Sequence, residues 1–391
     1  MGHPSPSDSS GVHPASASGG TGGALSNIFA RFSRWVDRYT GLSRLVRKPA
    51  SFPVQPARFA VQLFFLLVVV NVGFRFAAFV NSLGTTGPVA PRPAGVEAWL
   101  PISSLVSLRY LIMTGTWSPI HPAGLALFLI AIATGLLLKR AFCSWVCPIG
   151  FLSEFLAKLG FKISNKKFTL PPWLDWPLRM LKYLLLLFFI FAIMVAMKAD
   201  ALKSFIASPY NKVADIKMML FFTKLSATAA IILGLLLVLS VFIPYFWCRY
   251  LCPYGALLGF TGVYSAIKVR RNEDTCINCG QCTKMCPAAI TVHKLDAVVS
   301  DECNACMLCV DACPVEDTLY FSPLRKTPRR RGFLQKYWLA FAVLAFFAVG
   351  VGIASLTGHW RSNITPDEYR MHFSRIDNPE YTHSAAMEQG K

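Results

Sequence analysis

Two closely spaced cysteine runs constrain this chain more than any other feature of its sequence. Each run reads C-x2-C-x2-C-x3-C-P, so three cysteines recur at equal spacing and a proline follows the fourth. A 4Fe-4S cluster needs four thiolate ligands, and a pair of such runs is the ligand pattern of two clusters. The runs comprise Cys276, Cys279, Cys282 and Cys286 before Pro287, and Cys303, Cys306, Cys309 and Cys313 before Pro314.

The two runs are expected to exchange their fourth ligands. In two-cluster proteins the first three cysteines of a run hold one cluster and the fourth serves the other. Structural zinc and disulfides are the alternatives, but zinc sites normally use two separated C-x2-C pairs. We therefore expect Cys276, Cys279, Cys282 and Cys313 at the first cluster, and Cys303, Cys306, Cys309 and Cys286 at the second.

The composition indicates a membrane protein with a small soluble domain. Of its 391 residues, 54% are hydrophobic and 15% are charged, and the mean hydropathy is +0.46, which is too apolar for an ordinary soluble protein. The net charge of +19 comes from basic residues beside apolar stretches, where they orient helices and meet anionic lipids. Nucleic-acid binding is disfavoured because no basic face with interleaved aromatic residues occurs elsewhere.

The expected fold is an α-helical membrane protein with a small α+β dicluster domain inserted before its last helix. Five stretches can span a bilayer, near 58–80, 122–141, 177–198, 226–247 and 333–356. The less apolar segment 98–118 is expected in the outer interface. We expect a disordered tail over 1–25, an interfacial amphipathic helix over 26–48, a four-helix membrane domain over 56–260, the dicluster domain over 266–326, a fifth transmembrane helix over 331–357 and a periplasmic tail over 358–391.

Charge and redox chemistry predict how the chain is oriented. Basic residues precede the first and fifth apolar stretches and follow the second, which predicts a cytoplasmic N-terminus and dicluster domain in a bacterial inner membrane. Thiolates kept for iron also need a reducing compartment. Five lysines between 198 and 224 oppose this orientation. No cleavable signal peptide is expected, and helix 26–48 could lie on the membrane or against the cytoplasmic domain.

A second cysteine pattern recurs as an internal repeat. The segments RAFCSWVCPIGFLSEF and YFWCRYLCPYGALLGF align at an offset of 105 residues, which predicts two related helical hairpins. Cysteines four apart share a helix face, so the four thiols could converge on one metal or a further cluster. Thiol pairs that handle copper or exchange disulfides, and cysteines that merely pack, are the alternatives. These cysteines are Cys143, Cys147, Cys248 and Cys252.

The remaining polar residues suggest little further chemistry. No apolar span carries a histidine and no CxxCH occurs, so no haem is indicated. No flavin is indicated either. His121 and His359 lie at outer ends of spans, where an interfacial role is favoured over a quinone pocket. Glu97, Asp200 and Asp215 are expected to be solvated. The tail from residue 359 is expected to be a docking strap for an outer partner.

The two CxxxCP motifs, at 143–148 and 248–253, followed by the double run at 276–314, resemble the membrane-bound polyferredoxins of the NapH and NosR type, to which the CcoG group is also similar. The resemblance covers about Arg58 to Pro323. It implies a cytoplasmic two-cluster ferredoxin on a helical membrane domain that exchanges electrons with quinol and supplies periplasmic reductase or maturation systems. The chain departs from NosR-like proteins in lacking a large N-terminal flavin domain, and from NapH-like proteins in its fifth span.

These features favour an electron-transfer protein that relays electrons between the quinone pool, or a cytoplasmic donor, and a respiratory or periplasmic redox partner. It would act as a quinol dehydrogenase-type subunit rather than a stand-alone enzyme. The alternative is an assembly factor that reduces or passes copper through the CxxxCP thiols, because thiols are soft ligands suited to Cu(I). A redox sensor is disfavoured, since two adjacent clusters suit relay better than switching.

Overall fold

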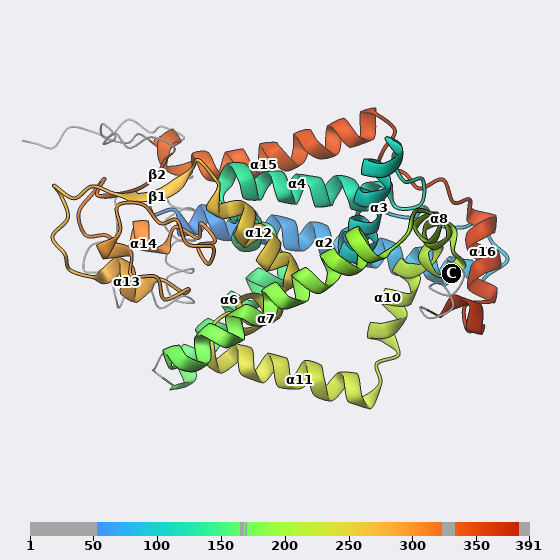
Figure 1. The fold of residues 1–391 in the computed structure, drawn as a ribbon, viewed down its shortest axis with the longest axis horizontal. Helices are drawn as coiled ribbons and strands as arrows, with labels where there is room; N and C mark the ends of the chain where they lie inside the picture. Colours follow the sequence, from blue (N-terminus) through green and yellow to red (C-terminus); the bar gives the residue numbers. More distant parts are fainter. Residues whose placement is uncertain (1–52, 165–167, 169, 323–332, 383–391) are drawn as a thin grey trace, which may run out of the picture. The chain divides into compact units, whose positions relative to one another are not determined.

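The computed structural model describes residues 53–164, 168, 170–322 and 333–382, without the side chains of 333–336. All of these belong to one compact unit, residues 48–391. The tail predicted over 1–25 and the helix predicted over 26–48 therefore fall outside the described residues. Figure 1 gives the arrangement of the elements within this unit.

The first hairpin is formed by two apolar helices joined by a helical connection. The leading helix, α2, has 29 residues, or about 43 Å at 1.5 Å per residue, enough to cross a bilayer. The chain leaves the second helix, α4, at Lys139, whose φ of 58° turns the backbone. The elements are α2 (Gln55–Leu83), η2 (Ala94–Trp99), α3 (Pro101–Thr114), α4 (Pro122–Leu138), α5 (Ala141–Trp145) and α6 (Pro148–Ser164).

The second hairpin repeats this plan with a longer connection. A π-helical turn ends its first long helix. A second π-helical turn, which carries the first cysteine of the second motif, begins at Trp247, after α11 has ended at Phe242. The elements are α7 (Pro172–Ile190), η3 (Phe191–Ala196), α8 (Ala199–Ala207), α9 (Pro209–Lys212), α10 (Ala214–Thr223), α11 (Ala227–Phe242), η4 (Trp247–Leu251) and α12 (Pro253–Val263).

Three continuous helices are long and apolar enough to cross a membrane: Gln55–Leu83, Pro172–Ala196 and Tyr337–Leu356. A fourth candidate is the pair α10 and α11, which is bent by 81°. The break has a local cause, because the Ser226 side chain accepts a hydrogen bond from Ala229 N and starts a new helix. The span expected near 122–141 is the shorter helix Pro122–Leu138. The chain is thus a membrane protein with three or four candidate spans among its described residues.

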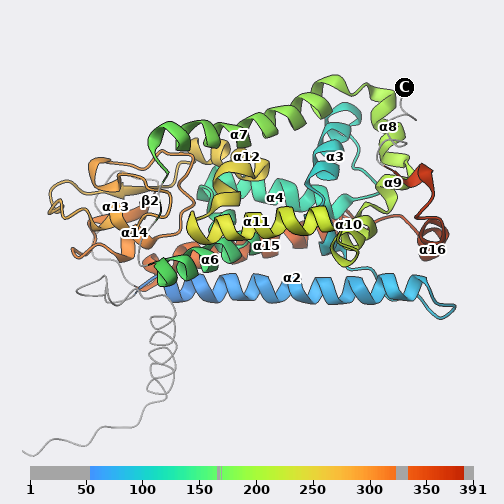
Figure 2. The same ribbon diagram turned by 90° about the horizontal axis from the view of Figure 1, so that it is seen from below.

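The small domain contains the two cysteine runs and one antiparallel strand pair. Strands β1 (Lys268–Arg271) and β2 (Leu319–Ser322) pair with Val269 opposite Phe321, and both side chains are buried. The helical turns α13 (Gln281–Met285), η5 (Val292–Lys294) and α14 (Leu308–Asp311) lie between the strands in sequence. Figures 1 and 2 show these elements beside the N-terminal end of α2, with α8 and α16 at the opposite end.

The chain after the small domain returns along the helices and then packs on their far ends. Helix α15 (Phe333–Leu356) contacts α4 and α2, and α16 (Pro366–Ser374) and η6 (Pro379–Tyr381) follow. Tyr369 and Tyr381 are each only 2% exposed, and Glu368 pairs with Lys212 at 2.6 Å. The described part of the tail is therefore packed on its own chain, and its docking to an outer partner stays a prediction.

A buried charged cluster corrects a second expectation. Glu97 and Asp215 were expected in solvent, but they are 0% and 2% exposed. The Arg92 guanidinium pairs with both carboxylates, at 2.8 and 2.7 Å, which offsets the cost of burying them. His121 is also buried, with Nε2 2.7 Å from the carbonyl oxygen of Asn211. The sequence gave no sign that Arg92 would also pair with Asp215, which is 123 residues away.

Candidate iron–sulfur sites

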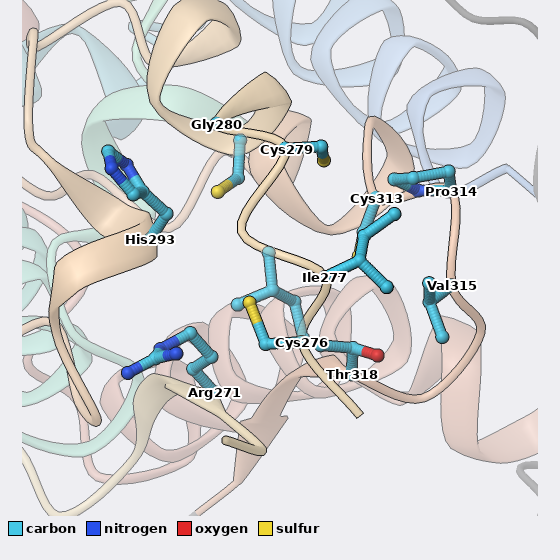
Figure 3. A pocket seen from close by; sticks show the side chains of 12 residues that line it. Arg271, Cys276, Ile277, Cys279, Gly280, His293, Cys313, Pro314, Val315 and Thr318 are labelled. Atoms are coloured by element: carbon cyan, nitrogen blue, oxygen red, sulfur yellow. The ribbon is translucent and has the colours of Figure 1, made fainter. Parts of the chain in front are cut away.

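The first site is a pocket at the solvent side of the small domain. It encloses about 340 Å³, and its lining includes Cys276, Cys279, Cys282 and Cys313. Three of these sulfurs come from the first run and one from the second, as the crossed assignment predicts. Figure 3 shows Cys276, Cys279 and Cys313 around this pocket. Cys279 is exposed and Ile277 is 64% exposed, so we call it the solvent-side pocket.

The second site is more enclosed and lies against the helices. It encloses about 370 Å³, and its lining includes Cys286, Cys303, Cys306 and Cys309, the second predicted set. We call it the helix-side pocket. Burial raises the pKa of Cys306 to about 12, so metal binding here must displace a proton from the thiol.

The backbone repeats the same turn in both runs. Asn278 and Ala305 each have a φ of 52°, and Gly280 and Met307, two residues later, have φ values of 70° and 63°. Left-handed residues turn the chain sharply, so each run curls around its own pocket. All twelve cysteines are free thiols. Among the described residues, no three or more His, Cys, Asp or Glu side chains are grouped to hold a single metal ion.

The structure brings the four CxxxCP cysteines of the two repeats near one another. Cys143 lies in α5 and Cys248 in η4, while Cys147 and Cys252 directly precede α6 and α12. The pKa of Cys147 is raised to about 12, first by burial and then by the nearby Cys143 and Cys252. Thiols from both repeats therefore lie within electrostatic reach of each other. Cys252 also accepts a hydrogen bond from Gly255 N at 3.2 Å.

Glycines explain how the helices after each motif come so close to it. A Cβ on Gly150 would lie 1.9 Å from the carbonyl oxygen of Cys143. A Cβ on Gly255, the matching residue of the second repeat, would lie 3.2 Å from the carbonyl oxygen of Cys248 and 2.6 Å from the Arg140 guanidinium. The first site thus needs a residue without a side chain, and at the second site a side chain would displace the Arg140 guanidinium. The sequence showed the match, but only the structure gives its reason.

The first CxxxCP motif touches the loop that carries the helix-side cysteines. Ser144 Oγ donates to the carbonyl oxygen of Asn304 at 2.5 Å, and Trp145 Nε1 donates to that of Ala305 at 3.0 Å. Ser144 and Trp145 lie between Cys143 and Cys147, and their partners lie between Cys303 and Cys306. The two cysteine sites are therefore joined by direct hydrogen bonds.

Two functional candidates were not foreseen from the sequence. Arg140 is 4% exposed and contacts the CxxxCP site. Its position three residues before Cys143 was a signal that could have been noticed. Asp311 is 6% exposed and accepts hydrogen bonds from Val54 N and Gln55 N, each at 3.0 Å. Nothing in the sequence indicates that contact, since its partners are more than 250 residues away.

Comparison with known proteins supports this description. A family model for a 4Fe-4S dicluster domain matches residues 270–321. A second model, a 4Fe-4S binding domain, matches residues 120–171 and 225–272, which contain the two CxxxCP motifs. No solved structure gives a significant match.

Relatives of known sequence cover much of the chain. YccM of Escherichia coli, whose name provisionally assigns it to electron transport, is 42% identical over 316 residues, covering 80% of this chain and 88% of YccM. The ferredoxin-type protein NapH of Escherichia coli is 30% identical over 49% of this chain and 66% of NapH. The regulatory protein NosR of Stutzerimonas stutzeri is 28% identical over 44% of this chain and 23% of NosR. The chain binds 4Fe-4S clusters and belongs to the NapH/NosR-type family of membrane-bound polyferredoxins.

Proposed function

We propose that this iron–sulfur electron-transfer protein relays electrons between the solvent-side pocket, the helix-side pocket and the four CxxxCP cysteines, in either direction. A bound cluster supplies one-electron transfer. The residues of the chain hold each cluster, set its exposure and fix the order of the sites. The pair of hydrogen bonds from Ser144 and Trp145 to the Cys303–Cys306 loop is the observation that carries this proposal.

The CxxxCP cysteines fit a further cluster in their donor set. All four are sulfur donors, none is in a disulfide, and thiolates are the usual ligands of iron–sulfur clusters. The match of a 4Fe-4S binding model to both repeats supports the same assignment. We therefore assign Cys143, Cys147, Cys248 and Cys252 to a third cluster, beside the two held by the crossed ligand sets.

The partners follow from the position of each site. The solvent-side pocket, with exposed Cys279 beside it, suits exchange with a soluble donor or acceptor. The CxxxCP site lies at helix ends and suits exchange with quinone or quinol in the membrane. We propose that the small domain faces the cytoplasm of a bacterial inner membrane, as the distribution of basic residues favours, and that a respiratory or periplasmic protein is the other partner.

Iron and acid-labile sulfide content of the purified full-length protein tests the third cluster. We expect about twelve irons per chain, four for each of three clusters, and about eight after Cys143, Cys147, Cys248 and Cys252 are all changed to Ser. Mössbauer spectroscopy of both proteins should show that the lost iron belonged to a 4Fe-4S cluster. About eight irons in both proteins would contradict the third cluster.

The same preparations test the alternative role as an assembly factor. Buried free thiols also suit Cu(I). If the protein holds about eight irons and binds Cu(I) only while the four CxxxCP cysteines are present, copper handling replaces the relay through these cysteines.

A further inference from the structure

We propose that Arg140 and Tyr245 donate hydrogen bonds to the sulfur atoms of the CxxxCP cluster and raise its reduction potential. The inference rests on the third cluster of the proposed function. The two residues occupy equivalent places, each three residues before the first cysteine of its motif and 105 residues apart. The repeat has thus kept a hydrogen-bond donor at this position while changing its type.

Arg140 joins three parts of the structure at this site. Its Nε donates to Cys143 Sγ at 3.3 Å, and its Nη2 donates to the carbonyl oxygen of Cys248 at 3.3 Å. The guanidinium therefore lies between the cysteines of the two repeats. Its Nη1 donates to the carbonyl oxygen of Asp301 in the small domain, also at 3.3 Å.

The charge of Arg140 is only weakly neutralised by carboxylates. Among the described residues its one ion pair is with Glu302, at 3.9 Å. Glu302 makes a much closer pair with Lys182, at 2.5 Å. A buried cation without a close carboxylate is costly, so an anionic partner is expected nearby. The thiolate ligands of a cluster that includes Cys143, the sulfur next to Arg140 Nε, would supply that negative charge.

Tyr245 carries a buried donor with nothing to bind. Its hydroxyl is enclosed and has no hydrogen-bond partner in the described part of the chain. The side chain lies within electrostatic reach of Glu154 and Arg58, and also of Cys306 and Cys248. Its backbone is left-handed, with a φ of 59°, which is uncommon for tyrosine. Buried hydroxyls are normally hydrogen-bonded, and a sulfur acceptor at the CxxxCP site would give this one its partner.

These donors act on the potential in one direction. The reduced form of a cluster carries one more negative charge than the oxidised form, so a nearby cation and hydrogen bonds to sulfur stabilise the reduced form more. Removing either donor should make reduction less favourable. Loss of the Arg140 charge should have the larger effect, because hydrogen bonds to charged groups are stronger than neutral ones.

Redox titration followed by electron paramagnetic resonance tests the inference on the full-length protein in detergent. The signal of interest is the one that disappears when the four CxxxCP cysteines are changed to Ser. We expect Arg140→Gln to lower its reduction equilibrium constant at least tenfold, which is about 59 mV for a one-electron couple. Tyr245→Phe should lower the constant about fivefold, from the loss of one hydrogen bond worth about 1 kcal/mol.

Matched controls come from the second repeat. Arg249 and Tyr250 bind Asp175, at 3.0 and 2.5 Å, so Arg249→Gln and Tyr250→Phe change the same residue types where the side chain is bonded to a carboxylate and not to sulfur. Both should leave the reduction equilibrium constant within twofold of the wild-type value. The iron content should stay at the wild-type value in all variants. If Arg140→Gln loses iron, Tyr245→Phe still decides, since its hydroxyl makes no hydrogen bond to any residue that the structure describes.

The outcomes separate the inference from the proposed function. A wild-type protein without a signal that depends on the CxxxCP cysteines contradicts the third cluster itself. A cysteine-dependent signal whose potential is unchanged in Tyr245→Phe, and in an iron-replete Arg140→Gln protein, contradicts only the inference. Equal shifts in the Arg249 and Tyr250 controls would also overturn it, because they would show a structural effect.

Discussion

Replacing Asp311 with Ala should loosen the attachment of the small domain to the first long helix. Helix α2 has no side-chain cap from its own N-terminal residue, Val54. The Asp311 carboxylate takes that role, accepting from Val54 N and Gln55 N at 3.0 Å. Each bond to a charged acceptor is worth about 1.5–3 kcal/mol, and losing a helix cap costs about 0.5–2 kcal/mol. We take about 3 kcal/mol for the pair, because Val54 is only 3% exposed and water replaces the carboxylate poorly.

Hydrogen–deuterium exchange of the full-length protein measures this effect. A loss of 3 kcal/mol corresponds to a more than hundredfold rise in local opening, seen as faster exchange at Val54 and Gln55. Asp311→Asn keeps one acceptor oxygen and should show about a tenfold rise. Asp296→Ala is the control, since that side chain is 79% exposed. Exchange within threefold of wild type in an iron-replete Asp311→Ala protein would refute the reasoning.

Two further changes test the packing around the CxxxCP site. Gly150→Ala should lower the thermal stability and iron content, because its Cβ would lie 1.9 Å from a backbone oxygen. Gly73→Ala, with nothing within 4 Å, should leave both unchanged. Burial alone would raise the pKa of Glu154, but Arg58 and Lys158 hold it at about 2, below its ordinary 4.5. Because the folded-state pKa is the lower one, Glu154 should contribute about 3 kcal/mol above pH 4.5 that is lost as the pH falls towards 2. The free energy of unfolding, measured between pH 4.5 and 2, should fall with pH in the wild-type protein. This dependence on pH should be absent in Glu154→Gln.

Local chemistry made much of the fold predictable. The cysteine spacing depends on the shape of a cluster, so the ligand sets could be predicted from positions alone, and the same sets line two pockets. The long apolar helices at 55–83 and 337–356 were equally plain. The span predicted over 226–247 begins at Ser226, a helix-capping residue type that caps α11. The 81° bend between α10 and α11 was not predicted, because the segment before 226 was interpreted as a loop.

What escaped the sequence depends on contacts between distant residues. The burial of Asp215 requires Arg92, which is 123 residues away in sequence and which the fold places 2.7 Å from it. The cap from Asp311 crosses more than 250 residues. Such pairs carry no periodicity or spacing, so pattern reasoning treats each charged residue as solvated. The close approach at Gly150 escaped for a different reason: its neighbour is a backbone oxygen, and no side-chain type in the sequence marks such a contact.

The two repeats have diverged where their motifs meet the rest of the chain. In the first, Ser144 and Trp145 donate to the loop of the helix-side pocket. Their counterparts in the second, Arg249 and Tyr250, donate instead to Asp175 of α7. Within the described residues, the first motif but not the second is therefore bonded to the small domain through the residues between its cysteines. Electrons from the small domain would reach the CxxxCP site through that first motif. We therefore expect the membrane partner to exchange electrons at the second motif and α7.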